Sequence, residues 1–299
     1  VIATDLHGYK LDELKRRIVD SNVDDALFNV TCMAADLLGC RNSEVFLMRD
    51  KEVDSSFVEK IEKMVERRCK NEPLQYILGE WSFLDFDVIV GPEALIPRPE
   101  TEDVFEDAAN LIKSNIIPVF GADFSFADVG TGTGVLGISV ARKFTESRGT
   151  LVDISEKALF LANKNLKRFS GLADRVSLRQ GDLLSGFDFE SLNFVISNPP
   201  YIDAHDMGCL MPEVRCYEPH LALYGGEDGL DLIRKLIVQS AKVLKAGGIL
   251  IFEHGHGQQE KILELFSSVD WLIPQGKNDL SGRERYVYAQ KKGFLLQDA

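Results

Sequence analysis

The second half of the chain alternates short apolar runs with longer amphipathic segments, and this alternation limits the fold more than any other feature. The apolar runs have the pattern of strands, and the segments between them have the spacing of helices. Successive strand-helix-strand units predict a mostly parallel sheet with helices on both faces. Ligands of such sheets gather at the carboxyl ends of the strands. We expect strands at 126–129, 150–153, 176–178, 194–196, 249–252 and 285–289, and helices at 134–144, 155–169, 228–245 and 258–267.

The first part of the chain has a different pattern and predicts short helices between residues 10 and about 70. Gly39 stands where a glycine would end one helix, and Ser56-x-x-Glu59 is a capping box that predicts the start of another. The apolar stripes of these helices can pack against one another, although a surface for docking a partner stays open. Alternating apolar residues over 81–90 predict a β-hairpin. We expect a helical bundle at 1–79, a hairpin linker at 80–97 and an α/β domain at 98–299.

The predicted strand at 194–196 leads into Asn198-Pro199-Pro200-Tyr201. Each proline fixes φ and has no backbone N–H, so we expect the carbonyls of this tetrapeptide to be free to accept hydrogen bonds from a ligand. The side chain of Asn198 adds a carbonyl acceptor and an NH₂ donor, which complement another amide or an amino group on a ring. The tetrapeptide therefore predicts a site that holds an NH₂ group.

A glycine-rich turn, Asp128-Val129-Gly130-Thr131-Gly132-Thr133-Gly134, follows the first strand of the sheet. Its glycines let the backbone approach a ligand closely, and Asp128 can engage a polar or cationic group of that ligand. Gly132-x-Gly134-x-x-Gly137 also satisfies a dinucleotide-binding fingerprint, with Asp153 at the end of the second strand. Taken alone, the turn fits a nicotinamide cofactor, S-adenosylmethionine or a purely structural role.

The tetrapeptide favours S-adenosylmethionine, because a dehydrogenase does not need a group that grips an amide after its fourth strand. A glycine-rich first turn, an acidic end to the second strand, Gly181-Asp182 after the third strand and Asn-Pro-Pro-Tyr after the fourth occur in this order. In these features the sequence resembles the class I S-adenosylmethionine-dependent methyltransferases that act on amino or amide nitrogen. The resemblance implies a Rossmann-like, mostly parallel seven-stranded α/β sheet, here with a small N-terminal helical bundle joined by a β-hairpin.

Two groups share the Asn-Pro-Pro-aromatic motif: adenine methyltransferases of DNA or RNA, and protein glutamine methyltransferases. The flanking motifs resemble the HemK/PrmC family, which methylates the side-chain amide of the glutamine in the Gly-Gly-Gln motif of peptide chain release factors. The resemblance covers nearly the whole chain and implies that the helical domain docks the release factor. The motifs that carry it are Pro73-Leu74-Gln75-Tyr76-Ile77-Leu78-Gly79, Leu95-Ile96-Pro97-Arg98-Pro99-Glu100-Thr101-Glu102, Glu218-Pro219, Gly225-Gly226-x-x-Gly229-Leu230 and Glu253-His254-Gly255 with Gln258 or Gln259.

The resemblance also implies roles for single residues. Asn198, the Pro199 carbonyl, Pro200 and Tyr201 would form the catalytic pocket and hold the substrate amide, and Arg98 and Thr101 would belong to a loop that closes over it. S-adenosylmethionine, and its product S-adenosylhomocysteine, would contact Asn198 and the residues of the three preceding strand ends. Those residues are Asp128, Gly130, Thr131, Gly132, Thr133 and Gly134 for the methionine part, Asp153 for the ribose, and Asp182 and Leu183 for the adenine.

Charge and composition narrow the set of partners. The net charge is −13, which argues against a nucleic-acid substrate because phosphate neutralisation requires a basic excess. No apolar run approaches the roughly 20 residues that span a bilayer, so we expect no membrane contact. The five cysteines are scattered and form no CxxC pair, which fits a reducing cytosol, so we expect a cytoplasmic protein, with a monomer as the default. His254-x-His256 lacks a nearby third ligand, so we interpret both histidines as loop residues at the cofactor rim and expect no metal.

The sequence leaves three alternatives to glutamine methylation. Adenine-N6 methylation of DNA or RNA is the nearest alternative, because Asn198 could hold an adenine amino group equally well. A non-catalytic protein that binds translation factors through its helical domain comes next. A nicotinamide oxidoreductase comes last.

Overall fold

The computed structural model describes residues 4–5, 9–48 and 52–293. The chain divides into two compact units, Val1–Glu80 with Met211–Tyr217, and Trp81–Leu210 with Glu218–Ala299. The segment Met211–Tyr217, which follows the Asn-Pro-Pro-Tyr strand by ten residues in sequence, thus groups with the helical unit. Within the described residues, no helix has both the length and the apolar character needed to cross a membrane.

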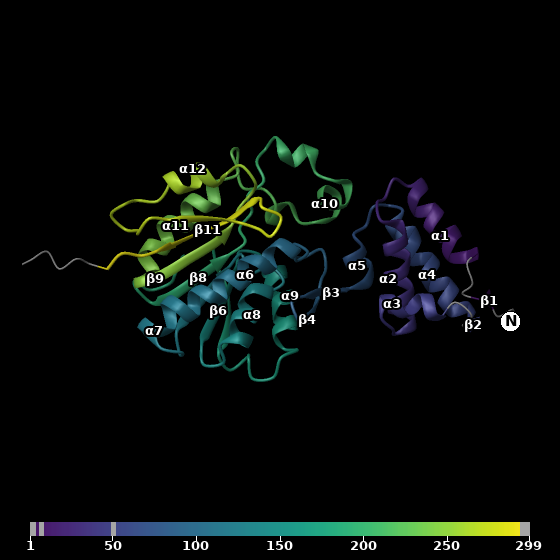
Figure 1. Cartoon of the computed structure of the whole chain (residues 1–299), viewed down its shortest axis with the longest axis horizontal. Helices are drawn as coiled ribbons and strands as arrows, with labels where there is room; N and C mark the ends of the chain where they lie inside the picture. The colour runs from purple at the N-terminus through teal and green to yellow at the C-terminus, as the bar shows by residue number, and fades with distance from the viewer. Residues whose placement is uncertain (1–3, 6–8, 49–51, 294–299) are drawn as a thin grey trace, which may run out of the picture. The chain divides into compact units, whose positions relative to one another are not determined.

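The helical unit consists of short amphipathic helices and one small pair of strands (Figure 1). Leu14 and Ile18 of α1 and Ile61 and Val65 of α4 are among its buried residues, so each helix turns an apolar stripe inward. The elements are β1 (Thr4–Asp5), α1 (Tyr9–Asp20), α2 (Ala26–Leu38), α3 (Asn42–Val45), η1 (Phe46–Met48), β2 (Glu52–Val53), α4 (Ser55–Arg68), α5 (Leu74–Leu78) and α10 (Pro212–Tyr217).

Two helix boundaries of this unit test the sequence signals. Gly39 ends α2 as predicted, with φ of 63° and its N–H donating to the carbonyls of Ala35 and Asp36. The capping-box prediction at Ser56 is wrong. The N-cap of α4 is Asp54, whose carboxylate accepts a hydrogen bond from the N–H of Phe57 at 2.8 Å. Asp is as good an N-cap as Ser, so the residue two positions earlier starts the helix.

Arg68, at the end of α4, is the buried hub of the helical unit. Its guanidinium donates to Asn29 Oδ1 at 2.7 Å, to the Glu72 carbonyl at 2.9 Å and to Glu213 Oε2 at 2.6 Å. Tyr217 donates from its hydroxyl to the Lys70 carbonyl at 2.7 Å. These bonds join α10 to the helices that come before it by more than 140 residues.

The second unit is built on a seven-stranded sheet in the order β10-β11-β9-β8-β5-β6-β7. The five strands from β9 to β7 are parallel, whereas β11 runs antiparallel between β9 and β10. A wholly parallel dinucleotide-binding sheet has no such inserted strand. The class I methyltransferase fold expected from the sequence is confirmed. The strands are β5 (Ser125–Val129), β6 (Arg148–Asp153), β7 (Val176–Gln180), β8 (Leu192–Ser197), β9 (Leu244–Glu253), β10 (Gln275–Asn278) and β11 (Glu284–Gln290).

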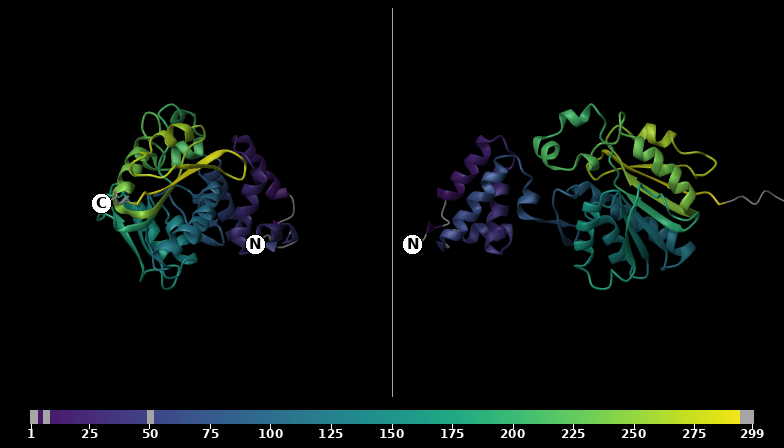
Figure 2. Two further views of the ribbon diagram at one scale, coloured as in Figure 1. Left: turned by 60° about the vertical axis from the view of Figure 1, so that its left-hand side comes forward. Right: turned by 180° about the vertical axis from the view of Figure 1, so that it is seen from behind.

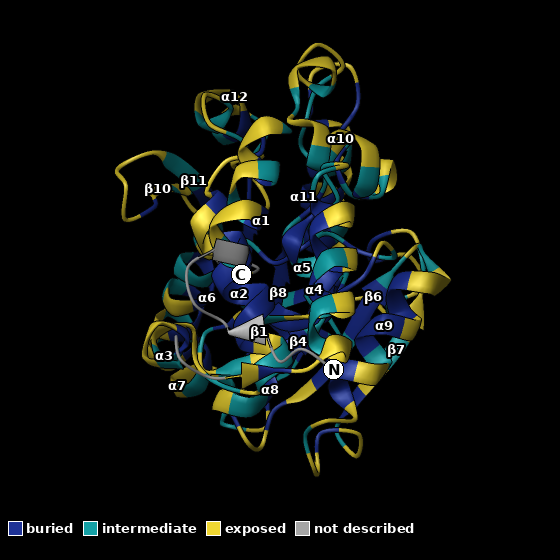
Figure 3. Ribbon diagram, turned by 90° about the vertical axis from the view of Figure 1, so that its right-hand side faces the viewer, coloured by how far each residue is buried: buried dark blue, intermediate teal, exposed yellow. Residues whose placement is uncertain are grey.

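Helices cover both faces of the sheet, as the alternation predicts. α6 (Pro99–Leu111), α8 (Val135–Lys143) and α9 (Glu156–Leu166) pack on one face, and α11 (Asp231–Val243) and α12 (Gln259–Glu264) pack on the other (Figures 1 and 2). All six residues of β8 are buried, which places this strand at the centre of the core (Figure 3). The short elements η2 (Ile112–Ile116), α7 (Ile117–Phe120), η3 (Asp206–Cys209) and η4 (His220–Ala222) complete the unit.

The predicted hairpin is confirmed as β3 (Glu80–Phe83) and β4 (Phe86–Ile89). The buried amide of Asn165, on α9, accepts from the N–H of Ile89 at 2.7 Å and donates to the Ile89 carbonyl at 3.0 Å. The same NH₂ group donates to the Thr133 carbonyl at 2.9 Å. One side chain thus fixes both the hairpin and the glycine-rich turn.

The sheet also differs from the sequence prediction in two places. β9 begins at Leu244, before the predicted start at 249, because it continues through a glycine pair that has the pattern of a turn. β10 was not predicted, because its residues Gln-Gly-Lys-Asn are polar and largely exposed. An edge strand of this kind has no apolar alternation to detect.

Candidate functional site

A cavity lies at the carboxyl ends of the parallel strands, beside the neighbouring strands β5 and β8 where the strand order reverses. Most of the residues singled out in the sequence line it, but Gly134, Pro199, Tyr201 and Arg98 are not on its wall. The predicted residues that line the cavity are Thr101, Asp128, Gly130, Thr131, Gly132, Thr133, Asp153, Asp182, Leu183, Asn198 and Pro200.

The glycine-rich turn forms one side of the cavity with its backbone. Gly130, Gly132 and Gly134 have φ values of 66°, 54° and 89°, a left-handed conformation that a residue with a Cβ adopts at a cost of roughly 1–2 kcal/mol. Gly137 has another reason to be glycine, because a Cβ there would lie 2.1 Å from Leu151 and 2.9 Å from the Asp128 Cβ. Three of these glycines are therefore required by the conformation of the turn, and Gly137 is required by the close packing of α8 against the sheet.

Asp128 lies under this turn and is completely buried. Its Oδ2 accepts from the Thr131 hydroxyl at 2.6 Å and from the Gly137 N–H at 2.8 Å. Its Oδ1 has no hydrogen-bond partner among the described residues. Burial raises the pKa of Asp128 to about 6. An unpaired carboxylate oxygen at a cavity wall fits a cationic group of a ligand, which would restore the lost solvation.

Asp153, at the end of β6, faces the same cavity. Its carboxylate accepts from the Gly132 N–H and the Ser155 N–H, both at 2.9 Å. Burial raises its pKa. A carboxylate offers about four acceptor positions, so acceptor capacity remains for the hydroxyls of a ligand.

The tetrapeptide that follows β8 is backed by glycines. A Cβ on Gly225 would lie 2.7 Å from the Pro200 carbonyl oxygen, and one on Gly229 would lie 2.3 Å from the Tyr201 carbonyl oxygen. That Tyr201 carbonyl accepts from the Gln258 amide at 2.9 Å. The prediction that all four carbonyls are free is therefore wrong for Tyr201, because a side chain beyond β9 has taken its oxygen.

A chain of side-chain hydrogen bonds holds Asn198. Its Nδ2 donates to Thr101 Oγ1 at 3.3 Å, and the Thr101 hydroxyl donates to Glu253 Oε2 at 2.8 Å. Tyr201 donates from its hydroxyl to Glu253 Oε1 at 3.1 Å. Glu253 is 1% exposed, and burial raises its pKa while the hydroxyl of Thr101 and the charge of Arg285 act in the opposite direction.

Glu253 belongs to one of the motifs that carry the family resemblance, but no role was predicted for it from the sequence. The available signal was a carboxylate directly after the apolar run 249–252, at the same edge of the sheet as Asp128 and Asp153. Burial and the nearby Glu253 charge raise the pKa of the Tyr201 hydroxyl, which therefore stays protonated. Tyr201 acts on the site from behind the cavity wall.

Arg98 precedes α6 and forms an ion pair with Glu218. Glu218 is buried and also accepts from the Ile96 N–H at 3.1 Å. Thr101 lies in the first turn of α6, which begins at Pro99, and proline is favoured at the first position of a helix. Arg98 thus joins the start of α6 to Glu218. The next residue, Pro219, lines the cavity.

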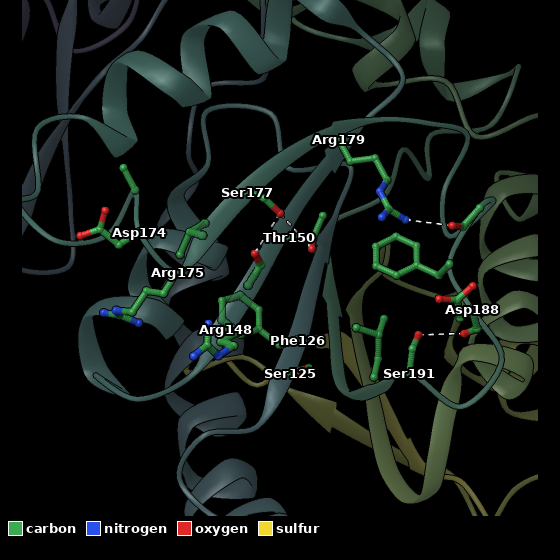
Figure 4. Close-up of a pocket in the computed structure, with 16 residues that line it drawn as sticks. Ser125, Phe126, Arg148, Thr150, Asp174, Arg175, Ser177, Arg179, Asp188 and Ser191 are labelled. Carbon is green, nitrogen blue, oxygen red and sulfur yellow. Dashed lines mark hydrogen bonds between the residues drawn. The ribbon is translucent and has the colours of Figure 1, made fainter.

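A second cavity has a volume of about 460 Å³, compared with about 170 Å³ for the strand-end cavity. Neither Asn198 nor the glycine-rich turn lines this second cavity. It lies over Thr150 and Ser177, on the face of β6 and β7 that no helix covers, because residues 181–191, all of them described, contain none (Figure 4). Its Arg179 donates to the Gly186 carbonyl and lies over the Phe187 ring. Size therefore does not identify the site.

His254 has a different environment from the predicted cofactor rim. His254 is fully buried at the end of β9, does not line the strand-end cavity, and burial lowers its pKa. Among the described residues, the three side chains close enough to share a metal ion are His205, Asp206 and Cys209, all exposed.

Comparison with known proteins bears on both units. The model of the PrmC N-terminal domain matches residues 11–79, and the model of the methyltransferase small domain matches residues 103–211. A release factor glutamine methyltransferase of Streptomyces coelicolor is 33% identical, and the match covers 92% of this chain and 95% of that protein. The chain belongs to the release factor glutamine methyltransferase family.

Other members of the release factor glutamine methyltransferase family match over similar lengths. The protein of Geobacter sulfurreducens is 32% identical over 93% of this chain and 94% of its own. The protein of Gloeobacter violaceus is 38% identical over 79% of this chain and 81% of its own. Among solved structures, the hMettl16 catalytic domain in complex with MAT2A 3′UTR hairpin 6 matches with a TM-score of 0.51 and 11% identity, covering 79% of this chain and 81% of that one. This last likeness concerns the fold.

Proposed function

We propose that the protein transfers a methyl group from S-adenosylmethionine to the side-chain amide nitrogen of the glutamine in the Gly-Gly-Gln motif of peptide chain release factors. The observation that carries the proposal is the position of Asn198, whose amide lines the same cavity as the glycine-rich turn and Asp128. Family membership, with relatives named for this activity across most of their length, supports glutamine over adenine as the acceptor.

The residues present fit this cofactor. The unpaired Oδ1 of Asp128 matches the cationic amino group of its methionine part, and the left-handed glycines leave room for the chain of that part. Asp153 has acceptor capacity left for the ribose hydroxyls, and Asp182 and Leu183 line the wall where an adenine would lie. Bound S-adenosylmethionine supplies an electrophilic methyl group on its sulfonium.

The chain contributes alignment and acceptors. An amide nitrogen is a weak nucleophile because its lone pair is delocalised into the carbonyl. Asn198 Oδ1, on the cavity wall, accepts an N–H group of the substrate amide and turns its nitrogen toward the methyl donor. The Pro199 carbonyl, which lies off that wall, is the second acceptor that the family resemblance implies. The same acceptors stabilise the positive charge that develops on nitrogen, which then loses its proton readily.

The helical unit is assigned to docking of the release factor, because residues 11–79 match the PrmC N-terminal domain. On this proposal residues 1–79 recruit the substrate, the hairpin at 80–97 joins the domains, and residues 98–299 carry out the transfer. We also propose a cytoplasmic monomer that needs neither nucleic acid nor metal.

The test is mass spectrometry of a release factor incubated with the protein and S-adenosylmethionine. We expect one added methyl group on the peptide that contains Gly-Gly-Gln, and none on a release factor in which that glutamine is alanine. Methylation of duplex DNA or RNA under the same conditions, with an unmodified release factor, would overturn the proposal.

A further inference from the structure

The direction of the hydrogen bonds behind Asn198 determines which of its two amide atoms faces the cavity. Thr101 is 3% exposed and Glu253 is 1% exposed, so neither side chain can exchange its partner for bulk water. The contacts run from Asn198 to Thr101 at 3.3 Å and from Thr101 to Glu253 at 2.8 Å. Asn198 follows β8 directly, Thr101 lies in the first turn of α6, and Glu253 is the last residue of β9.

A threonine hydroxyl has a single proton, and an ionised carboxylate can only accept. Thr101 therefore donates its proton to Glu253, and its oxygen is left with lone pairs alone. The atom of Asn198 that contacts Thr101 must then be the NH₂ group. Asn198 Oδ1 is consequently turned away from Thr101, toward the cavity.

The carboxylate of Glu253 is supported as an acceptor from two sides. Tyr201 donates to its second oxygen at 3.1 Å, and the positive charge of Arg285 favours its ionised form. Burial is the strongest influence on Glu253 and raises its pKa, and the charge of Glu100 acts in the same direction. The role of the carboxylate as an acceptor is carried by the contacts themselves, from Thr101 at 2.8 Å and from Tyr201 at 3.1 Å. Two hydroxyl donors and one cation thus face this carboxylate.

We propose that Thr101 and Glu253 act as a specificity-determining pair, which orients Asn198 so that the site accepts a carboxamide and rejects a carboxylate of the same shape. The inference rests on the proposed function. With Oδ1 facing the cavity, a glutamine offers N–H groups to it, whereas a glutamate offers only oxygens, which Oδ1 repels. A freely rotating Asn198 could turn its NH₂ group inward and accept the glutamate.

The experiment compares Thr101→Val with Thr101→Ser. Valine keeps the shape of threonine and removes the hydroxyl, and serine keeps the hydroxyl. The probes are a release factor with Gly-Gly-Gln as substrate and the same factor with Gly-Gly-Glu as competitive inhibitor. The measured quantity is the ratio of the inhibition constant of the glutamate form to the KM of the glutamine form.

We expect wild-type protein and Thr101→Ser to bind the glutamate form at least about 100-fold more weakly than the glutamine form. In Thr101→Val this ratio falls by about 10-fold or more, because Asn198 is no longer held in one orientation. A purely structural role would weaken both forms together and leave the ratio unchanged. Thr101→Ser is the matched control, because it keeps the hydroxyl that contacts Asn198 and Glu253.

The outcomes separate this inference from the proposed function. If wild-type protein does not methylate the release factor, the proposed function fails. If wild-type protein methylates it and Thr101→Val keeps the wild-type ratio, the inference fails while the function stands. Melting temperature and calorimetric binding of S-adenosylmethionine establish that each variant is folded, and an unfolded Thr101→Val is replaced by Thr101→Ala in the same comparison.

Discussion

The two sides of the strand-end cavity are built in different ways. The side next to β5 is made of backbone, with three glycines in left-handed conformation over the carboxylate of Asp128. The side next to β8 is made of side chains, with Asn198 held through Thr101 by Glu253. The backbone side suits a ligand that is the same in every reaction cycle, and the side-chain side can select one functional group over another.

The largest expected effect comes from the side-chain half. Asn198→Ala removes the acceptor for the substrate amide, and we expect kcat to fall by about 10²- to 10³-fold, as for the loss of one positioned group in the transition state. Affinity for S-adenosylmethionine should stay within about 3-fold, because the glycine turn is untouched. Steady-state kinetics and calorimetry measure the two quantities. Full turnover in this variant would contradict the assignment of substrate recognition to the side-chain side of the cavity.

The second prediction concerns the backbone half. Gly132→Ala places a Cβ at φ of 54°, and we expect affinity for S-adenosylmethionine to fall by about 10- to 100-fold while kcat at saturating cofactor changes little. Gly186→Ala is the matched control, since Gly186 has φ of 81° with no atom within 4 Å of the added Cβ. It should lose similar stability and bind the cofactor normally. Equal binding defects in both variants would show that backbone strain, and not the cavity, is responsible.

The residues on the two sides of the cavity could be predicted from the sequence to different extents. The glycine turn is contiguous, so its spacing alone located Gly130, Gly132, Gly134 and Asp128. The Asn-Pro-Pro-Tyr strand end was found for the same reason. The residues that hold Asn198 lie 97 positions before it and 55 after it, so no local pattern joins them. Such contacts are made by the sheet, which brings distant strand ends to one edge.

A third prediction uses the pH dependence of Asp128. Its folded-state pKa of about 6 lies above the ordinary value of 3.8, so the folded protein binds more protons than the unfolded chain between these values. Stability in the absence of cofactor should therefore be highest below about pH 4 for this group and fall by about 2–3 kcal/mol as pH rises to 6. Burial raises the pKa of Asp153 and Glu253 as well, which adds a contribution of the same sign.

Asp128→Asn isolates the contribution of this one group. Its Oδ1 can accept from Thr131 and Gly137 in place of the original Oδ2, and its NH₂ group is neutral. We expect the variant to unfold in denaturant at a higher midpoint than wild type at pH 7.5 and to bind S-adenosylmethionine about 10- to 100-fold more weakly. A variant that is less stable than wild type at this pH would contradict the assignment of an unpaired buried charge.

The smallest effect is expected outside both halves. Asp54→Ala removes the N-cap of α4 and should lower the free energy of unfolding of the helical unit by about 1 kcal/mol. Ser56→Ala should change it by a few tenths at most, because Asp54 and not Ser56 accepts the capping bond. Neither variant should alter cofactor affinity in calorimetry. A larger loss in Ser56→Ala would restore the capping box that the sequence suggested.

The helix-free connection between β7 and β8 has a practical consequence. It starts at Gly181 and Asp182 in the strand-end cavity and returns to the amino end of β8, so Phe189, which is 66% exposed, lies at the opposite end of the strands from Asn198. The polar face of β6 and β7, with Thr150, Ser177 and Arg179, lines a separate cavity and has no helix over it. A fluorophore or short affinity tag inserted beside Phe189 would label the enzyme during turnover without entering the strand-end cavity.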